Sequence, residues 1–367
     1  MGTLTASALL LAGPGGLAGC GAVDAKKSAD AAAANLSAAK VVAFTMSLKD
    51  PKGSLLATAT TAEDKRVAQF IESSSLTVTI DPAGDATFGS ATKAPQAAPK
   101  DLVAALKNSG AMRLDLTRSG KSVVGLTIVN GVIYTRVDLA ELSTVSGQQL
   151  SEQLADAPPM LAPVVDGLKT GKWLSLDLPA LLAKYPELAK MASAGAGGAA
   201  TPSPQAMLGL QSKLLAAFEA NSTKTVTASG DQTEVRLTVK AKAFLTAVVD
   251  TMAATGAVPG TASSLSDLKS GLSSLPDGTV DVILTIKADH YTSAVFDLQS
   301  LAKLSKDPKA VSYTAGEQLR VDINDQAAAV TAPAAGQVVD LNSLVQSVLS
   351  QLAASGRPLS SLAGGGA

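Results

Sequence analysis

Apolar and polar residues alternate in five segments of the chain. In residues 112–117, Met112, Leu114 and Leu116 alternate with Arg113 and other polar side chains. The same alternation occurs in residues 124–128, 234–240 and 319–324, and in residues 280–287 except that Ile283 interrupts the polar positions. This pattern is typical of strands with one buried and one solvated face. We therefore expect an antiparallel sheet, because parallel strands that are buried on both faces read as unbroken apolar runs.

Short polar or glycine-containing dipeptides separate these segments. Asn130-Gly131 is a strong signal for a two-residue hairpin turn between residues 126–129 and 132–137. Ser119-Gly120, Gly230-Asp231 and Asp289-His290 stand at three further positions where a hairpin would turn. The strands are therefore expected to pair mainly with their neighbours in sequence.

Helical patterns occupy the segments between the strands. Residues 24–40 are rich in alanine and lack proline and glycine, which favours a helix. Four Asp-Leu-x-x-Leu segments begin at Asp138, Asp177, Asp297 and Asp340, each between a strand-like run and a helical pattern. Aspartate is a good helix N-cap, and we favour that role over a cluster of catalytic carboxylates. Further helices are predicted at residues 100–108, 139–154, 178–192, 205–221, 243–254 and 341–353.

Composition excludes several classes of function. The net charge of -1 offers no basic surface for nucleic acid, and the scattered Lys and Arg residues do not predict a patch for anionic membranes. The single Cys and single His exclude an internal disulfide, a cysteine-clustered zinc site and two-histidine metal motifs. We expect no metal, no cofactor and no enzymatic activity, because no catalytic constellation is visible.

The N-terminal segment resembles a bacterial lipoprotein signal. A short apolar run at residues 6–12 is followed by Leu17-Ala18-Gly19-Cys20, which is similar to the lipobox. By this resemblance, cleavage before Cys20 removes residues 1–19, the cysteine carries lipid, and residues 20–23 form a tether. Met1 to Thr5 carry no positive charge, which departs from the usual pattern. The alternative is an ordinary apolar N-terminus with a buried free cysteine.

A few other residues could carry chemistry. His290 could act as a general base, but its predicted place in a turn favours an exposed structural residue. Trp173 and Tyr134 could border the mouth of a ligand site, or could simply pack on their strands. The Ser-x-x-Lys segments at residues 37–40 and 266–269 lack the companion motifs of penicillin-recognising enzymes.

The order of these elements resembles the actinobacterial LppX/LprAFG lipoproteins, within the wider LolA-like group. The resemblance is carried by the lipobox, the alanine-rich helix, the Asn130-Gly131 hairpin before Val132-Ile133-Tyr134, and Lys172-Trp173-Leu174. It continues through residues 224–242, 280–287 and 290–298 to a final pair that ends near Val330 and Pro333. It implies an α+β fold, with a strongly curved antiparallel sheet, a half-barrel, and helices packed on its concave face.

The resemblance also implies an apolar cavity between sheet and helices that holds the acyl chains of lipids or lipoglycans. We expect a single domain at residues 24–355, a disordered tail at 356–367, and a monomer. The candidate lining residues are Leu114, Leu116, Leu126, Ile128, Tyr134, Trp173, Leu237, Val239, Val282, Leu284, Ile286 and Phe296.

Two functions follow from these expectations. The first is a lipid-binding or lipid-transporting lipoprotein, anchored through Cys20 at the outer face of the cytoplasmic membrane. The alternative is a cell-surface structural or signalling lipoprotein that binds another protein and has no lipid ligand. Alternation alone does not separate the two, because it shows a one-faced sheet and not whether the space above it is hollow.

Overall fold

The computed structural model of the chain divides into two compact units, and the single domain expected at residues 24–355 stays a prediction. The first unit comprises Met1–Thr79, Asp85–Ala98 and Ala200–Ala328, and the second comprises Ile80–Gly84, Pro99–Ala199 and Ala329–Ala367. The structure describes residues 20–50, 53–93, 102–154, 157–186, 217–218, 220–229, 231–255, 269–273, 275–303 and 317–354. The predicted signal peptide and tail lie outside these residues, as do most of the helix predicted at 205–221 and the end of that predicted at 178–192.

The fold is α+β, and its twelve described strands form one open, mostly antiparallel sheet. In the first unit the strand order is β2-β1-β11-β10-β9-β8-β7, and in the second it is β12-β6-β5-β4-β3. Strands β12 and β6 pair in parallel, whereas the other pairs of described register are antiparallel. The expectation of an antiparallel sheet is therefore confirmed for every pair of described register except β12 and β6.

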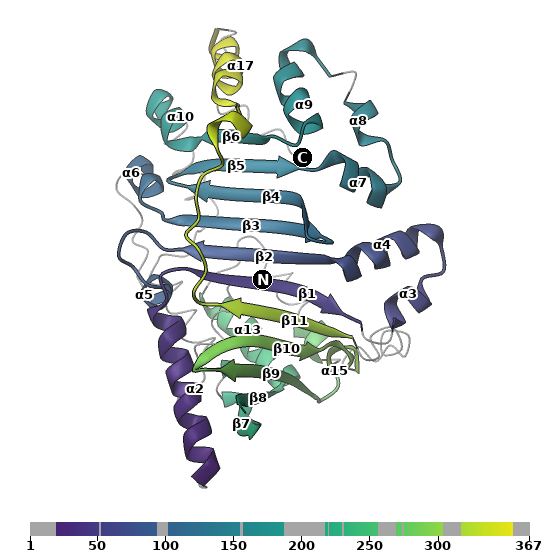
Figure 1. Ribbon diagram of the computed structural model, residues 1–367, viewed down its shortest axis with the longest axis vertical. Coiled ribbons are helices and arrows are strands. Elements are labelled where there is room, and N and C mark those ends of the chain that lie inside the picture. The colour runs from purple at the N-terminus through teal and green to yellow at the C-terminus, as the bar shows by residue number, and fades with distance from the viewer. Residues whose placement is uncertain are drawn as a thin grey trace. The chain divides into compact units, whose positions relative to one another are not determined.

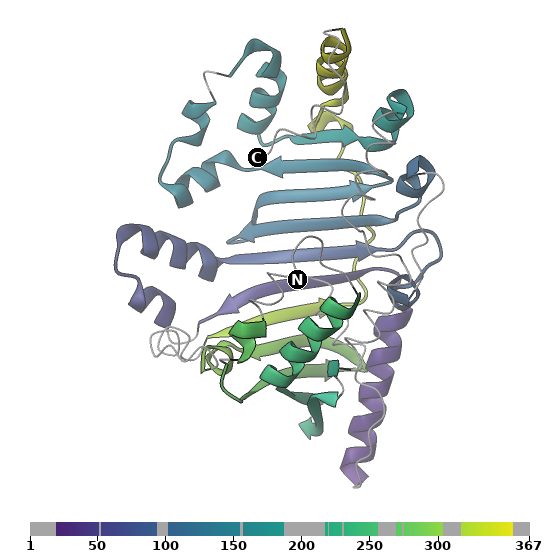
Figure 2. The same cartoon turned by 180° about the vertical axis from the view of Figure 1, so that it is seen from behind.

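In the described part of the first unit, seven strands combine with several helices (Figure 1). Helix α2 contacts strands β7 to β10 (Figure 2), and α13 follows directly after β8. Its strands are β1 (Val42–Lys49), β2 (Ser74–Asp81), β7 (Ser222–Ser229), β8 (Gln232–Lys240), β9 (Thr279–Lys287), β10 (His290–Asp297) and β11 (Gln318–Asn324). Its helices are α2 (Cys20–Ala38), α3 (Ser54–Thr58), α4 (Ala62–Ser73), α5 (Phe88–Lys93), α13 (Ala241–Thr255) and α15 (Leu298–Ala302).

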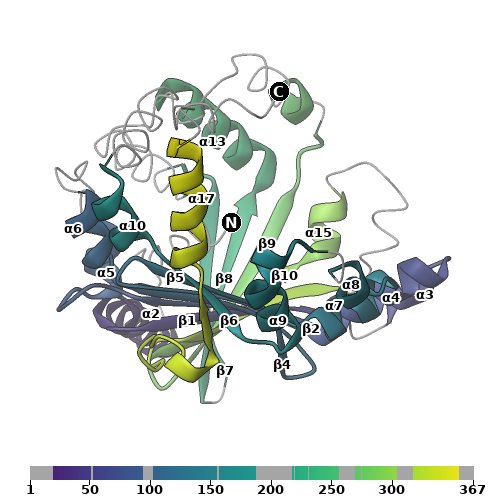
Figure 3. The same ribbon diagram turned by 90° about the horizontal axis from the view of Figure 1, so that it is seen from above.

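The described residues of the second unit form five strands, with helices at both ends of those strands. Helices α10 and α17 lie side by side (Figure 3), and Lys184 and Tyr185 hydrogen-bond to Gln346 between them. Its strands are β3 (Ala111–Arg118), β4 (Lys121–Val129), β5 (Val132–Val137), β6 (Trp173–Asp177) and β12 (Val338–Asp340). Its helices are α6 (Leu102–Lys107), α7 (Leu139–Ser146), α8 (Leu150–Gln153), η1 (Pro159–Leu161), α9 (Ala162–Lys169), α10 (Leu178–Lys184), η3 (Ala335–Gln337) and α17 (Asn342–Ala354).

Two of the predicted turns are confirmed and one is shifted. Asn130 and Gly131 have φ angles of 53° and 79°, and Ser119 and Gly120 have 49° and 80°, so all four adopt the left-handed conformation of a tight hairpin. Between β9 and β10 the positive angles belong to Ala288 and Asp289 instead. His290 is consequently the first residue of β10, and our placement of it in the turn was wrong. Gly230 lies outside the described residues.

All four Asp-Leu-x-x-Leu aspartates accept backbone N–H groups at a helix start; three of them hold the predicted N-cap position, and Asp340 stands one residue before it. Asp138 accepts hydrogen bonds from the backbone N–H groups of Ala140 and Glu141, and Asp177 accepts one from Ala180. Asp297 and Asp340 accept the N–H groups of Gln299 and Asn342. The one helix predicted at 139–154 is two, because Gly147 ends α7 with a φ of 69°.

Helix α2 begins at Cys20, so residues 20–23, which we had expected to form a tether, are its first turn. Four side chains on one face are almost completely buried: Ala25, Ala29, Ala32 and Leu36, at 0 to 2% exposure. Three of these are alanines, which allows the helix backbone to lie close to the sheet. Hydrogen bonds from Ser28 and Asn35 to Asp289, each 2.8 Å long, attach the helix to the β9–β10 turn.

Candidate ligand-binding surface

The second unit has one sheet face that consists mainly of apolar side chains. The strand register aligns them directly: Leu114 faces Leu126, and Ile128 lies between Met112 and Ile133. Every one of these side chains is only half-buried. We call this set the apolar face of the second unit; its members are Met112, Leu114, Leu116, Val124, Leu126, Ile128, Ile133, Val137, Leu174, Leu176 and Val339.

On β4 and β6 the opposite face is packed more tightly, although most of its residues there are small or polar. Val123, Gly125, Thr127, Trp173 and Ser175 are buried there. The indole of Trp173 lies against Gly125, where a Cβ atom would come 2.7 Å from the ring. On β4 and β6 burial is thus the reverse of what alternation predicts, because the apolar side of these strands is the more exposed one.

Two predicted lining residues belong to this opposite face. Tyr134 pairs with Thr127 and Ser175, and Trp173 packs on Gly125, with the guanidinium of Arg136 5.5 Å from the indole centroid. Neither shares a face with Leu126 and Ile128, so the structure does not bring them together with the other candidates of this unit. The packed role, which we had left open for Trp173, matches its 7% exposure.

Helix α9 covers one margin of the apolar face. A Cβ atom on Gly167 would lie 2.9 Å from Val339 and 3.3 Å from Leu174, so the helix backbone rests directly on these two side chains. We did not predict α9 from the sequence. One sequence signal for this helix was present, because Pro163 stands in its first turn. In the structure Val165 and Gly167 are the buried residues of the helix.

The first unit also has an apolar sheet face, and most of the side chains on it are buried. Leu237 faces Val282, Leu284 faces Val235, and Ile286 lies beside Tyr291. The predicted lining residues among them, Leu237, Val239, Val282, Leu284 and Ile286, are between 1 and 8% exposed. Phe296, on the same face beside Val282, is half-buried.

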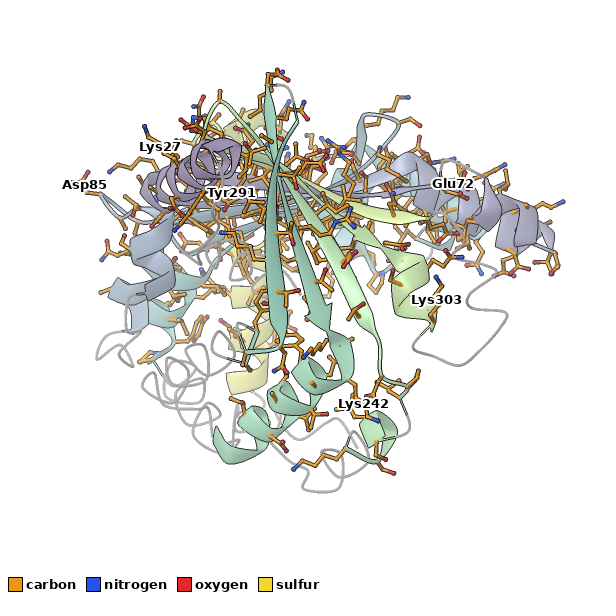
Figure 4. The ribbon with its side chains drawn as sticks, turned by 90° about the horizontal axis from the view of Figure 1, so that it is seen from below. Lys27, Glu72, Asp85, Lys242, Tyr291 and Lys303 are labelled. Carbon is orange, nitrogen blue, oxygen red and sulfur yellow. The ribbon has the colours of Figure 1, made fainter. Side chains whose placement is uncertain are left out.

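Helix α2 covers part of this face. Burial raises the pKa of the Tyr291 hydroxyl, and the nearby Asp30 carboxylate of α2 raises it further. Figure 4 shows Tyr291 beside α2. Since Tyr291 pairs with Ile286 across β9 and β10, the helix packs on the side that carries Ile286 and Leu284. These residues are core residues between sheet and helix.

A shallow polar hollow of about 270 Å³ lies at one end of the second unit's strands. Asp81, Lys107 and Asn130 contribute polar groups to it, and the Asp81 carboxylate accepts the N–H of Val330 at 2.9 Å. None of the predicted lining residues takes part in it. This hydrogen bond holds the chain that follows β11 against Asp81. The Asp81 carboxylate therefore has a structural role in the hollow.

His290 forms a specific pair but not a metal site. Its Nδ1 atom lies 2.7 Å from Oδ2 of Asp325, whose side chain is 7% exposed. Among the described residues, no group of three or more His, Cys, Asp and Glu side chains could hold a metal ion. The pair connects the start of β10 with the residue after β11.

Comparison with protein-family models and with curated proteins gives no match. The resemblance to LppX/LprAFG lipoproteins therefore remains a prediction from the sequence. In the described part of the chain, no helix has both the length and the apolar character needed to cross a membrane.

Proposed function

We propose that the protein is a lipid-anchored lipoprotein that holds acyl chains against the apolar face of the second unit. The observation that carries this proposal is the half-burial of Leu114, Leu126, Ile128 and their neighbours, on a face where alternation predicts the core. A contiguous apolar patch that is not fully buried commonly marks a binding surface. Acyl chains would cover it with a gain of about 25 cal/mol per Å² of apolar area buried.

The resemblance to LppX/LprAFG lipoproteins supports the same proposal. In that fold the sheet is strongly curved, and helices on its concave face enclose the acyl chains. We propose the same half-barrel arrangement here, with α9 at one margin of the apolar face. The core residues of the first unit, including Leu284 and Ile286, are left out of the proposed lining because α2 already covers them.

In this proposal the protein is a passive carrier rather than an enzyme. It works as a monomer without cofactor, tethered by the lipid on Cys20 to the outer face of the cytoplasmic membrane. The ligand is an acylated lipid or lipoglycan, since the proposed lining offers contacts to acyl chains and few polar groups for recognition.

The direct test is mass spectrometry of organic extracts from protein purified without detergent. Acylated lipid in stoichiometric amount is the expected result. An extract without lipid, together with a ligand-free interior that is filled by the chain's own side chains, would contradict the proposal. That outcome would favour the alternative in which the lipoprotein binds another protein.

Paired variants locate the ligand on the sheet. Leu126→Gln places an amide in the apolar face and should reduce the amount of co-purified lipid severalfold, because the amide loses water without gaining a partner. Arg113→Gln on the neighbouring strand is the control, since Arg113 lies on the other face and is exposed. Equal lipid content in the two variants would place the ligand elsewhere.

A further inference from the structure

Helix α2 is attached rigidly to the first unit almost from its first turn. Ala25 and Ala29 are 2% and 0% exposed, and Ser28 is hydrogen-bonded to Asp289. The helix begins at Cys20, so a single turn separates this cysteine from the packed part. The N-terminal turns continue past β7, the strand at the edge of the sheet (Figures 1 and 2).

This geometry sets the height of the unit above a bilayer if Cys20 carries lipid, as in the function proposed above. A helix rises about 1.5 Å per residue, so Lys26 and Lys27 lie about 10 Å along the axis from Cys20. The headgroup layer on each side of a bilayer is about 5 to 7 Å thick. Lysine side chains are long enough to reach its phosphates from that height.

The fold adds a third lysine to these two. Lys224 on β7 is half-buried beside α2. Burial lowers the pKa of its ammonium group, Asp30 raises it, and Lys26 lowers it, so these two helix residues are charges close to Lys224. Lys27 points outward from the helix (Figure 4). Lys26 and Lys224, which are about 200 positions apart in the sequence, therefore lie close together near the N-terminal end of α2.

We propose that Lys26, Lys27 and Lys224 form a surface that binds the phosphates of anionic lipids and turns the β7 edge of the first unit toward the membrane. The inference rests on the anchoring part of the proposed function and not on the acyl-chain ligand. Asp24 and Asp30 offset part of the positive charge, so the lipid on Cys20 supplies the attachment and the lysines supply the orientation. A lipid chain together with basic residues is a known combination of membrane signals.

The test uses the lipidated chain with a fluorophore on Thr225→Cys, an exposed position on β7. Cys20 is the only native cysteine, so the added thiol is labelled alone once Cys20 is lipidated. The protein is placed in phosphatidylcholine vesicles with or without phosphatidylglycerol, and a headgroup-attached nitroxide quenches fluorophores at phosphate depth. We expect quenching in the phosphatidylglycerol vesicles and its loss at high salt.

Charge-neutralised variants separate the surface from the anchor. Lys26→Gln/Lys27→Gln/Lys224→Gln should lose the quenching, whereas Lys242→Gln/Lys303→Gln should keep it, because Lys242 on α13 and Lys303 after α15 project elsewhere (Figure 4). Quenching that is absent, or independent of phosphatidylglycerol and of the three lysines, would overturn the inference. The mass of the mature N-terminus tests the anchor separately. If Cys20 carries no lipid, both the anchoring and the fixed height of the unit are overturned. This outcome does not depend on whether acyl chains are found bound to the protein.

Discussion

The indole ring of Trp173 lies directly over the backbone of Gly125, so that a Cβ atom on the glycine would come 2.7 Å from Cη2 and 3.2 Å from Cζ3. The contact joins β6 to β4 across the intervening β5, on the face opposite the proposed lipid surface. It explains why glycine stands in the middle of a strand, where it is otherwise unfavourable.

Gly125→Ala should therefore destabilise the protein by about 1 to 3 kcal/mol, because the methyl group forces the indole or the strand to move. Denaturant unfolding, followed by the fluorescence of the single tryptophan, measures the change. Gly336→Ala is the control, since a Cβ atom there meets no atom within 4 Å. Equal stabilities for the two variants would show that the Trp173 contact is not as close as described.

Tyr291→Phe should stabilise the first unit. The side chain is 1% exposed and its hydroxyl has no hydrogen-bond partner among the described residues. Removal of a buried hydroxyl without a partner should gain about 1 kcal/mol. Thermal unfolding of the variant would show a higher Tm, and a lower one would mean that the hydroxyl has a partner.

The same residue predicts a loss of stability in alkali. The pKa of Tyr291 is raised in the folded protein, mainly by burial, so the unfolded chain releases this proton at lower pH. The free energy of unfolding should fall as pH rises above the ordinary tyrosine pKa of about 10. Tyr291→Phe should show a smaller fall across that range, whereas Tyr134→Phe, in the second unit, serves as the comparison.

The pair of His290 and Asp325 should show measurable coupling. A double-mutant cycle with His290→Ala and Asp325→Ala at neutral pH should give an interaction of about 1 to 3 kcal/mol, because the Asp325 carboxylate is nearly buried. The exposed pair of Arg320 and Asp322, with side chains 42% and 47% exposed, should give less than about 1 kcal/mol in the same cycle. The opposite ranking would indicate that desolvation of Asp325 cancels the attraction.

The capping box of α4 predicts a shifted titration. Hydrogen bonding with Thr61 lowers the pKa of the Asp64 carboxyl, with a smaller contribution from Thr60. The contribution of this carboxylate to stability is present above its ordinary pKa and is lost as pH falls through the lowered value. Thr61→Ala should return the pKa toward its ordinary range, measured by NMR titration of the side chain. Thr60→Ala should have a smaller effect, and equal shifts would argue against the capping box.

Local features of this protein were predictable from local sequence. Alternation located five of the twelve described strands, Asn130-Gly131 located a hairpin, and aspartates 138, 177, 297 and 340 marked helix starts, because each signal depends on neighbours within a few residues. The shift of one turn to Ala288-Asp289 shows the limit, since the register of β9 and β10, with its irregularity after Tyr291, sets where the chain reverses.

The tertiary structure decided what those elements do together. Alternation by itself determined that apolar side chains share one side of each strand, but not which side is covered. Helix α2 covers part of the apolar face that includes Leu284, whereas the face that includes Leu126 stays half-buried, and Tyr134 and Trp173 lie opposite to it. The proximity of Lys224 to Lys26 likewise depends on helix docking. Such relations arise from packing between segments far apart in the chain, where no local periodicity carries information.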